Sequence, residues 1–446
     1  MYIMKSLLFI LLCFCFVDGS AQKKDGKKKV KDTERIEESY FDKNTIRYDN
    51  IVYKDYIKSV TLYRPGLAIS STILALNGQD KLVLGFDDLS GKMKDYNYTV
   101  FHCTSDWELT DMMETEYLSG FYDNYISDYE FSFNTLQKYI HYEFSFPNED
   151  ANITKSGNYV LYVFEDNDQE KPILTRRFNV TENGINILPN LKRASKIDDR
   201  DYRQEIDFNL VYGTVPIMNP YSNVKVYIQQ NGRIDNMISG LKPIFVKDTE
   251  LVYDFDEANV FDGNNEFRFF DFKSLNYQSI NVQKYDKNDT TNLIYLKMDV
   301  KRTFKNYYST NELNGKYVID RENANDPDVD SDYGFVHFQL KYFEPIQGGD
   351  LYVFGAFSDW KFKEEFKMTF NEDKGIYEAN IYLKQGYYNY QYVLLSDNKK
   401  VGDVSFIEGT HFETENDYTI YVYYTDPAQR YERLIGVKEF NSIKGR

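Results

Sequence analysis

Cysteine is scarce in this 446-residue chain, which excludes a fold held together by disulfides. Two of the three cysteines lie in an apolar run near the start, and only Cys103 lies beyond it. One thiol cannot form an internal disulfide, so ordinary hydrophobic cores must stabilise the fold. A chain of this length has enough residues for two or three such cores.

Histidine is almost as rare, and the common catalytic motifs are missing. None of the four histidines stands at a metal-ligand spacing from another, and a lone histidine on a strand is usually a hydrogen-bonded structural residue. His102 and Cys103 are neighbours, so on a strand they would point to opposite faces and could not act as base and nucleophile. No Gly-x-Ser-x-Gly elbow or phosphate loop occurs. The sequence therefore predicts a non-enzymatic protein with no catalytic residue, cofactor or metal site.

Long apolar runs are also lacking, apart from "SLLFILLCFCFV", which has 12 residues. About 20 apolar residues are needed to cross a bilayer, so we expect no transmembrane span. Lys5 precedes this run, and small residues follow it up to Ala21. This pattern is typical of a secretory signal peptide, here residues 1–21.

The chain has no excess of positive charge, because its 70 acidic residues outnumber its 53 basic ones and give a net charge of −17. Binding to nucleic acid needs a positive footprint, so a nucleic-acid partner is not expected. The stretch "KKDGKKKVK" (23–31) is the exception. We interpret residues 22–44 as a flexible charged arm, with contact to anionic lipid headgroups as the alternative.

Helical periodicity is nearly absent, whereas aromatic residues make up 17% of the chain, with 41 Tyr and 33 Phe. Segments such as "YVLYVFED" and "VKVYIQQ" alternate with period two, which favours strands. The sequence thus predicts a mostly-β chain of tandem immunoglobulin-like or E-set β-sandwich domains. The expected domains are an N-terminal sandwich (45–182), a central β domain (183–310) and a C-terminal sandwich (311–446).

One inserted stretch and one acidic stretch interrupt the strand patterns of these domains. The N-terminal sandwich carries a long insertion (106–135), and long ordered loops tend to be functional. In "NANDPDVDSD" (323–332), alternating aspartates could offer oxygens to calcium, but the central glycine and the glutamate of an EF-hand loop are missing. We therefore expect a solvent-exposed acidic loop there. Its aspartates are Asp326, Asp328, Asp330 and Asp332.

The stretch "VPIMNPY" (215–221) is a candidate partner-binding loop. Its two prolines fix φ and prevent a strand from continuing, so the residues between them form a preset turn. A preset turn binds a partner at a lower ordering cost. The alternative is a sheet-edge crossover without a partner. The candidate binding residues are Pro216, Met218, Asn219, Pro220 and Tyr221.

The C-terminal stretch "FGAFSDW" resembles the glycogen-binding sandwich modules of starch-active enzymes. Trp360 corresponds to the tryptophan that ends the Phe-x-x-Trp turn of these modules, where it often packs structurally. Trp360 is also the candidate residue for glycan binding. A sugar platform usually needs a second exposed aromatic residue, and the other tryptophan, Trp107, lies in a different predicted domain.

One long stretch in the middle of the chain is distinctive: "VYGTVPIMNPYSNVKVYIQQNGRIDNMISGLKPIFVKDTELVYDFDEANVFDGNNEFRFFDFKSLNYQS". This stretch resembles the Plug protein family of the type IX secretion system. Three further stretches match sequences of that family in the same order along the chain: "FHCTSDWELTDMMETEYLSG", "SGNYVLYVFEDND" and "RYERLIGVKEFNS". The resemblance implies a periplasmic protein at the inner face of the outer membrane. It would dock, as one copy in a hetero-complex, on the large translocon β-barrel and plug its pore. The alternative function is a periplasmic polysaccharide-binding protein.

Export predicts a defined mature N-terminus. Because small residues follow the apolar run up to Ala21, we expect cleavage before Gln22. Intact-mass spectrometry of the protein recovered from the periplasm checks this. A chain that still begins at Met1 would contradict the prediction.

Overall fold

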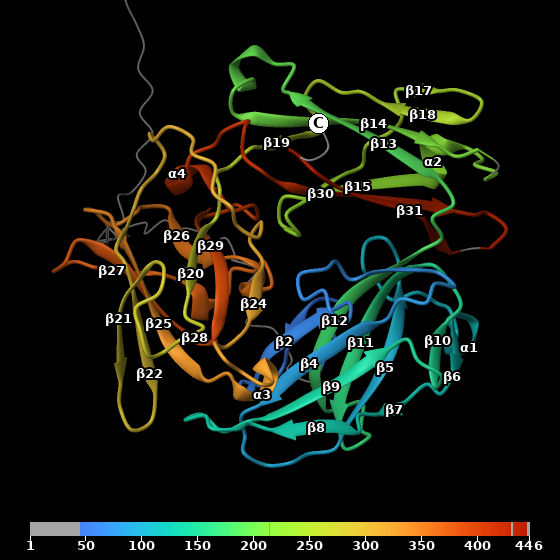
Figure 1. Ribbon diagram of the computed structural model, residues 1–446. Coiled ribbons are helices and arrows are strands. Elements are labelled where there is room, and N and C mark those ends of the chain that lie inside the picture. Colours follow the sequence, from blue (N-terminus) through green and yellow to red (C-terminus); the bar gives the residue numbers. More distant parts are fainter. Residues whose placement is uncertain (1–44, 214, 430, 444–446) are drawn as a thin grey trace, which may run out of the picture. The chain divides into compact units, whose positions relative to one another are not determined.

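The computed structural model describes residues 45–213, 215–429 and 431–443, and strands are the main regular secondary structure among them (Figure 1). The expected signal peptide and charged arm lie outside the described residues. The helical elements are single turns of three or four residues. The prediction of a mostly-β chain is confirmed. No helix in the described part of the chain is long and apolar enough to cross a membrane.

Two sheets built from residues 51–181 enclose one core. One sheet has the order β1-β12-β11-β5-β7, and β3 pairs with β12; the other has the order β2-β4-β9-β8. Side chains from both sheets, such as Phe86 and Leu161, share the same buried cluster. The strands are β1 (Ile51–Val52), β2 (Ile57–Tyr63), β3 (Ile73–Ala75), β4 (Leu82–Asp88), β5 (Tyr96–Cys103), β7 (Asn124–Tyr125), β8 (Asp128–Phe131), β9 (Ile140–Phe146), β11 (Gly157–Glu165) and β12 (Pro172–Thr181).

The insertion in this first part contributes small elements of its own. The helical turn α1 (Glu114–Tyr117) leads into β6 (Leu118–Gly120), which pairs with β10 (Ala151–Ile153). β7 and β8 also lie within the insertion, and each pairs with a strand of a main sheet. The insertion is therefore ordered by strand pairing.

A second pair of sheets encloses the central core. One has the order β13-β14-β18-β17 with β19 beside β14, and the other has the order β16-β15-β30-β31. In β15, buried and half-buried residues alternate over its whole length, as the sequence pattern predicts. The elements are β13 (Asn186–Arg193), η2 (Ile197–Asp199), β14 (Arg203–Val211), α2 (Pro220–Asn223), β15 (Val224–Gln230), β16 (Ile238–Ser239), β17 (Phe245–Val246), β18 (Glu250–Tyr253), β19 (Val260–Asp262), β30 (Asp417–Thr425) and β31 (Glu432–Asn441).

A third pair of sheets is built around β25, β28 and β29. One has the order β21-β22-β25-β28-β27 with β23 beside β25, and in the other β20, β24 and β26 all pair with β29. The elements are β20 (Arg268–Asp271), β21 (Val282–Lys287), β22 (Asn292–Leu296), β23 (Asp299–Val300), β24 (Tyr317–Ile319), α3 (Pro327–Asp330), β25 (Tyr333–Lys341), β26 (Gly349–Phe354), η3 (Ala356–Ser358), η4 (Glu364–Phe366), β27 (Thr369–Asn371), β28 (Ile376–Lys384), β29 (Gly386–Ser396) and α4 (Ser405–Glu408).

Strand pairing runs across the boundary predicted at residue 310. β30 pairs with β15 along its length, from Val224 opposite Tyr424 to Gln230 opposite Tyr418. In Figure 1 the red strands β30 and β31 lie next to the green β15 in one sheet. Conversely, β20 pairs with β29. The central sheets therefore contain residues 417–441, and the third pair of sheets contains residues 268–300.

Cys103 is the last residue of β5 and is 1% exposed. Burial raises the pKa of its thiol to about 12, so the thiolate is disfavoured. The alternating stretch "NYTVFHCTSDW" predicts a buried structural thiol at Cys103, and its burial is confirmed.

Candidate functional site

The loop between β14 and β15 contains the predicted partner-binding residues. Asn219 has a φ of 49°, in the left-handed region, and Pro220 begins the helical turn α2. The main-chain oxygen of Asn219 accepts hydrogen bonds of 3.0 Å from the main-chain N–H groups of Ser222 and Asn223. Asn223 Nδ2 donates to the main-chain oxygen of Met218 at 2.9 Å. The loop is thus closed by its own hydrogen bonds, as expected of a preset turn.

One side of this loop is anchored and the other faces solvent. Ile217 packs against the central core, and the main-chain N–H of Met218 donates to Tyr424 Oη at 3.2 Å. The side chains of Met218 and Tyr221 are 60% and 54% exposed. Pro216 is also exposed. The loop therefore presents two apolar side chains on a fixed frame.

Trp360, the candidate glycan-binding residue, is wedged between other rings. Its ring lies 5.4 Å from that of Phe354 and 6.0 Å from that of Phe267. A Cβ on Gly315 would overlap the Trp360 ring, and one on Gly232 would lie 3.1 Å from its Nε1, so glycine is required at the first position and favoured at the second. Trp360 has a φ of 56°, which is uncommon for a bulky residue. Much of the Trp360 ring therefore packs against neighbouring residues of the protein.

The remaining face of Trp360 lines a cavity of about 900 Å³ that Trp107 also lines. Sequence reasoning placed the two tryptophans in different domains and found no second aromatic residue for Trp360. Tyr227 and Tyr421 line the same cavity and stand opposite each other in β15 and β30. Both are half-buried positions of alternating strands, so periodicity could have flagged them as facing away from the core. Only the long-range pairing shows that they meet.

Polar groups hold the aromatic side chains of this cavity in place. The Arg177 guanidinium lies 4.3 Å above the Trp107 ring, a cation–π contact. Asp106 accepts hydrogen bonds from Tyr227 Oη at 2.6 Å and from Lys225 Nζ at 3.1 Å. The bond from Tyr227 and the charge of Lys225 lower the pKa of the Asp106 carboxyl. Rings combined with a few fixed polar groups are typical of small-ligand sites.

The insertion of the first sandwich exposes a second set of aromatic side chains. All four residues of β8 are exposed, and β8 is the edge strand of its sheet. Phe131 is 64% exposed, and Phe133 just beyond the strand is 68% exposed. Edge strands with exposed apolar side chains tend to pair with other chains unless something covers them. The insertion is thus a second candidate docking surface.

The acidic stretch is not the solvent-exposed loop that its composition suggests. Val329, Asp330, Ser331 and Asp332 are buried. Asp332 accepts hydrogen bonds of 2.8 and 3.1 Å from two main-chain N–H groups at Leu136 and Gln137. The expectation was wrong because these donors come from the first sandwich, far away in the sequence.

The aspartates of this stretch also do not converge on one calcium ion. Asp326 caps α3 by accepting from the Asp328 main-chain N–H at 2.9 Å. Asp330 accepts from the main-chain N–H groups of Asn325 at 2.8 Å and Asp326 at 3.2 Å. Main-chain donors therefore occupy three of the four carboxylates, and only Asp328 keeps its side chain for another partner.

Comparison with known proteins gives a family match and matches to solved structures. Residues 57–182 match the type 9 secretion system plug protein 1st domain. The crystal structure of a hypothetical protein from Parabacteroides merdae ATCC 43184 is similar, with a TM-score of 0.86 and 31% sequence identity. That similarity covers 89% of this chain and 100% of the other. No curated protein matches the chain.

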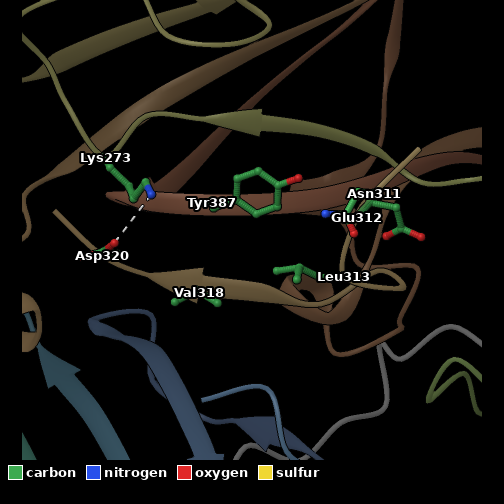
Figure 2. A pocket seen from close by; sticks show the side chains of 7 residues that line it. All are labelled: Lys273, Asn311, Glu312, Leu313, Val318, Asp320 and Tyr387. Carbon is green, nitrogen blue, oxygen red and sulfur yellow. Dashed lines mark ion pairs between the residues drawn. The ribbon is translucent and has the colours of Figure 1, made fainter. Parts of the chain in front are cut away.

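A smaller cavity of about 330 Å³ lies beside β24 and β29 (Figure 2). Figure 2 shows the Lys273–Asp320 ion pair, 3.7 Å long, apart from Glu312. Burial, and then the nearby Glu266 carboxylate, raise the pKa of Glu312 to about 8. The main-chain N–H of Asn314 donates to Glu312 at 2.5 Å but does not offset these effects. The Glu312 side chain is therefore protonated at neutral pH in the folded state.

This raised pKa predicts a pH-dependent loss of stability. The folded state keeps the Glu312 proton up to about pH 8, whereas an ordinary glutamate loses it near 4.5. Stability from this group is therefore complete below about pH 4.5 and falls as pH rises to 8. Between pH 5.5 and 8.5 the wild type should therefore lose stability, and we expect Glu312→Gln to reduce that loss by ~3 kcal/mol. Urea unfolding at the two pH values measures it.

A matched control uses the exposed Glu344. Glu344→Gln makes the same substitution on the surface of the third pair of sheets and should leave the wild-type pH dependence unchanged. Identical pH profiles for Glu312→Gln and the wild type would contradict the assignment.

Proposed function

The chain belongs to the type IX secretion system plug protein family, and on this premise we propose that it docks on the periplasmic end of the outer-membrane translocon and plugs its pore. The match of residues 57–182 to the first plug domain carries this proposal. The chain is thus a type IX secretion component, and its family is not a known enzyme family.

The proposed role requires a rigid cover and no chemistry. A wide, water-filled pore leaks small molecules unless a body closes it when no substrate is passing. Tandem β-sandwiches with separate buried cores supply such a body. Because the cover must leave when a substrate passes, a modest and partly polar interface suits it better than a large apolar one.

Two exposed surfaces support docking. The loop with Met218 and Tyr221 is preset, so it loses little conformational entropy on binding. The β8 surface with Phe131 and Phe133 lies inside the matched range 57–182 and offers an open strand edge. We propose that at least one of these two surfaces contacts the translocon.

The same proposal places the protein in the periplasm, at the inner face of the outer membrane. The signal peptide expected at residues 1–21 directs export, and the partner is the large translocon β-barrel. We propose one copy of this chain in the hetero-complex.

Deleting the protein tests this role. A cover takes no part in translocation itself, so we expect secretion to remain partly intact while the envelope leaks. Uptake of vancomycin, which is too large for ordinary porins, should rise several-fold in a deletion strain and return to normal with the wild-type gene. Equal uptake in both strains, with the translocon confirmed present, would overturn the proposal.

Complementing variants separate the two surfaces. Met218→Ala with Tyr221→Ala alters the loop, and Phe131→Ser with Phe133→Ser alters β8. Phe343→Ser is the matched control, since Phe343 is 77% exposed in the third pair of sheets. We expect one double variant to lose co-purification with the translocon and to leave vancomycin uptake high. The control variant should co-purify with the translocon and return vancomycin uptake to the wild-type level. Full function of both double variants would exclude these surfaces but not the plug itself.

The aromatic cavity favours polysaccharide binding as the second candidate function. Trp107, Trp360, Tyr227 and Tyr421 line a single space with fixed polar groups beside them. Sugar faces stack on such rings, while carboxylates and amides bind their hydroxyls.

Binding to an oligosaccharide array tests this second function. Trp107→Ala removes a ring held by Arg177 outside the core clusters, so the fold should survive. We expect glycan binding, if it is the function, to fall at least tenfold in this variant and to persist in Tyr277→Ala, a change at an exposed position elsewhere. If the wild-type protein binds no glycan on the array, polysaccharide binding is excluded as its function.

A further inference from the structure

One strand of the first sandwich points two potential metal ligands in the same direction. His141 and Glu143 are two residues apart in β9, so their side chains leave the same face of the sheet. His141 Nε2 lies 4.0 Å from Glu143 Oε2. The helical turn α3 adds Asp328, and one ligand atom from each of the three residues lies within 4.8 Å of the others.

His141 is oriented like a metal-bound histidine. Its side chain is 9% exposed, and its Nδ1 lies 2.7 Å from Asp87 Oδ1. A proton on Nδ1 donated to this carboxylate leaves the lone pair on Nε2. Nε2 is buried and has no hydrogen-bond partner among the described residues, although it is directed toward Glu143 and Asp328. A buried polar atom without a partner is costly, so it calls for a ligand.

Asp87 is itself fixed by further contacts. Its Oδ2 accepts from Tyr333 Oη at 2.6 Å and from Lys384 Nζ at 2.5 Å. A carboxylate behind a ligating histidine, held by its own hydrogen bonds, is the usual support of a protein metal site. The carboxylates of Asp87, Glu143 and Asp328 carry three negative formal charges and Lys384 one positive charge. Two negative charges therefore remain, which a divalent cation would balance.

We propose that His141, Glu143 and Asp328 bind one divalent transition-metal ion, with Zn²⁺ the best fit. One imidazole nitrogen and two carboxylate oxygens form a donor set that Zn²⁺ accepts, with water in the open position. Donors around a tetrahedral Zn²⁺ lie ~3.3 Å apart, so the ligands must close by about 1 Å. The Glu143 side chain is 45% exposed and free to make this movement.

The ion also has a path to the site and a structural consequence. Asp328 lines a cavity of about 520 Å³ together with Tyr63, and the Glu143 side chain is 45% exposed, so two of the three ligands can be reached from outside. Bound there, the ion would tie β9 of the first sandwich to α3, which precedes β25. It would stabilise that junction in addition to the direct contacts.

A second acidic cluster shows what a site without a metal looks like. Glu205, Asp207 and Asp254 also place ligand atoms within 4.8 Å of one another. Lys192 Nζ lies 3.1, 2.5 and 3.5 Å from these three carboxylates in that order. An ammonium group already holds this cluster together. At His141 the lysine contacts Asp87 and not Nε2, which leaves the position for a metal open.

Zn²⁺ binding to the chain beginning at Gln22 tests the proposal. Protein stripped with a chelator and titrated calorimetrically should bind one Zn²⁺ per chain, with a dissociation constant in the micromolar range or below. Bound metal stabilises the folded state, so the melting temperature should rise with Zn²⁺. Glu143→Gln with Asp328→Asn keeps the side-chain shapes and should weaken binding at least tenfold and abolish the rise.

Controls separate this site from other imidazoles and carboxylates. His337→Ala removes a histidine that stacks on Tyr295, far from the cluster in the sequence, and should bind Zn²⁺ like the wild type. Asp254→Asn alters the lysine-held cluster and should also have no effect on binding. A proton on Nε2 would satisfy the same carboxylates, and the wild type would then take up no Zn²⁺. That result, or equal Zn²⁺ binding by the wild type and the double variant, would overturn the proposal.

Discussion

The buried carboxylate of Asp87 is the group on which the junction between the first and third pairs of sheets depends. It lies in β4 with no exposed surface and contacts Lys384 of β28, Tyr333 of β25 and His141 of β9. Burial alone would raise its pKa, but the charge of Lys384 and the hydrogen bond from His141 lower it. Removing one partner of such a pair leaves an uncompensated charge and costs about 3–5 kcal/mol. Each of these four strands therefore constrains the others.

Buried tyrosine side chains also connect one sandwich to the next. A buried phenol packs like a hydrocarbon while its hydroxyl reaches a polar partner. Tyr139 Oη donates to the main-chain oxygen of Ser331 at 2.7 Å, and Tyr423 Oη donates to Asn158 Oδ1 at 2.6 Å. The first bond joins the first sandwich to the α3 region, and the second joins β30 to β11. The high tyrosine content thus builds the cores and the contacts between them with the same side chains.

Sequence reasoning succeeded where the determinant is local. The alternation of apolar and polar residues predicted β15, and the place of Cys103 in an alternating strand predicted its burial. The two prolines predicted the closed loop at 215–221. It failed where the determinant is distant. The burial of Asp332 depends on donors almost 200 residues away, and the meeting of Trp107 with Trp360 depends on the folded chain. Neither has a local signal, because composition and period describe one segment at a time.

The pairing of β30 with β15 has a consequence for the order in which the chain matures. β15 ends at residue 230, and its partner begins at residue 417, so the central sandwich closes only after almost the whole chain has become available. Contacts of such sequence separation form slowly. Until they form, β15 presents an open edge that invites aggregation or proteolysis. A chain cut short before residue 417 would keep that edge open, so only chains that include β30 can close the central sandwich.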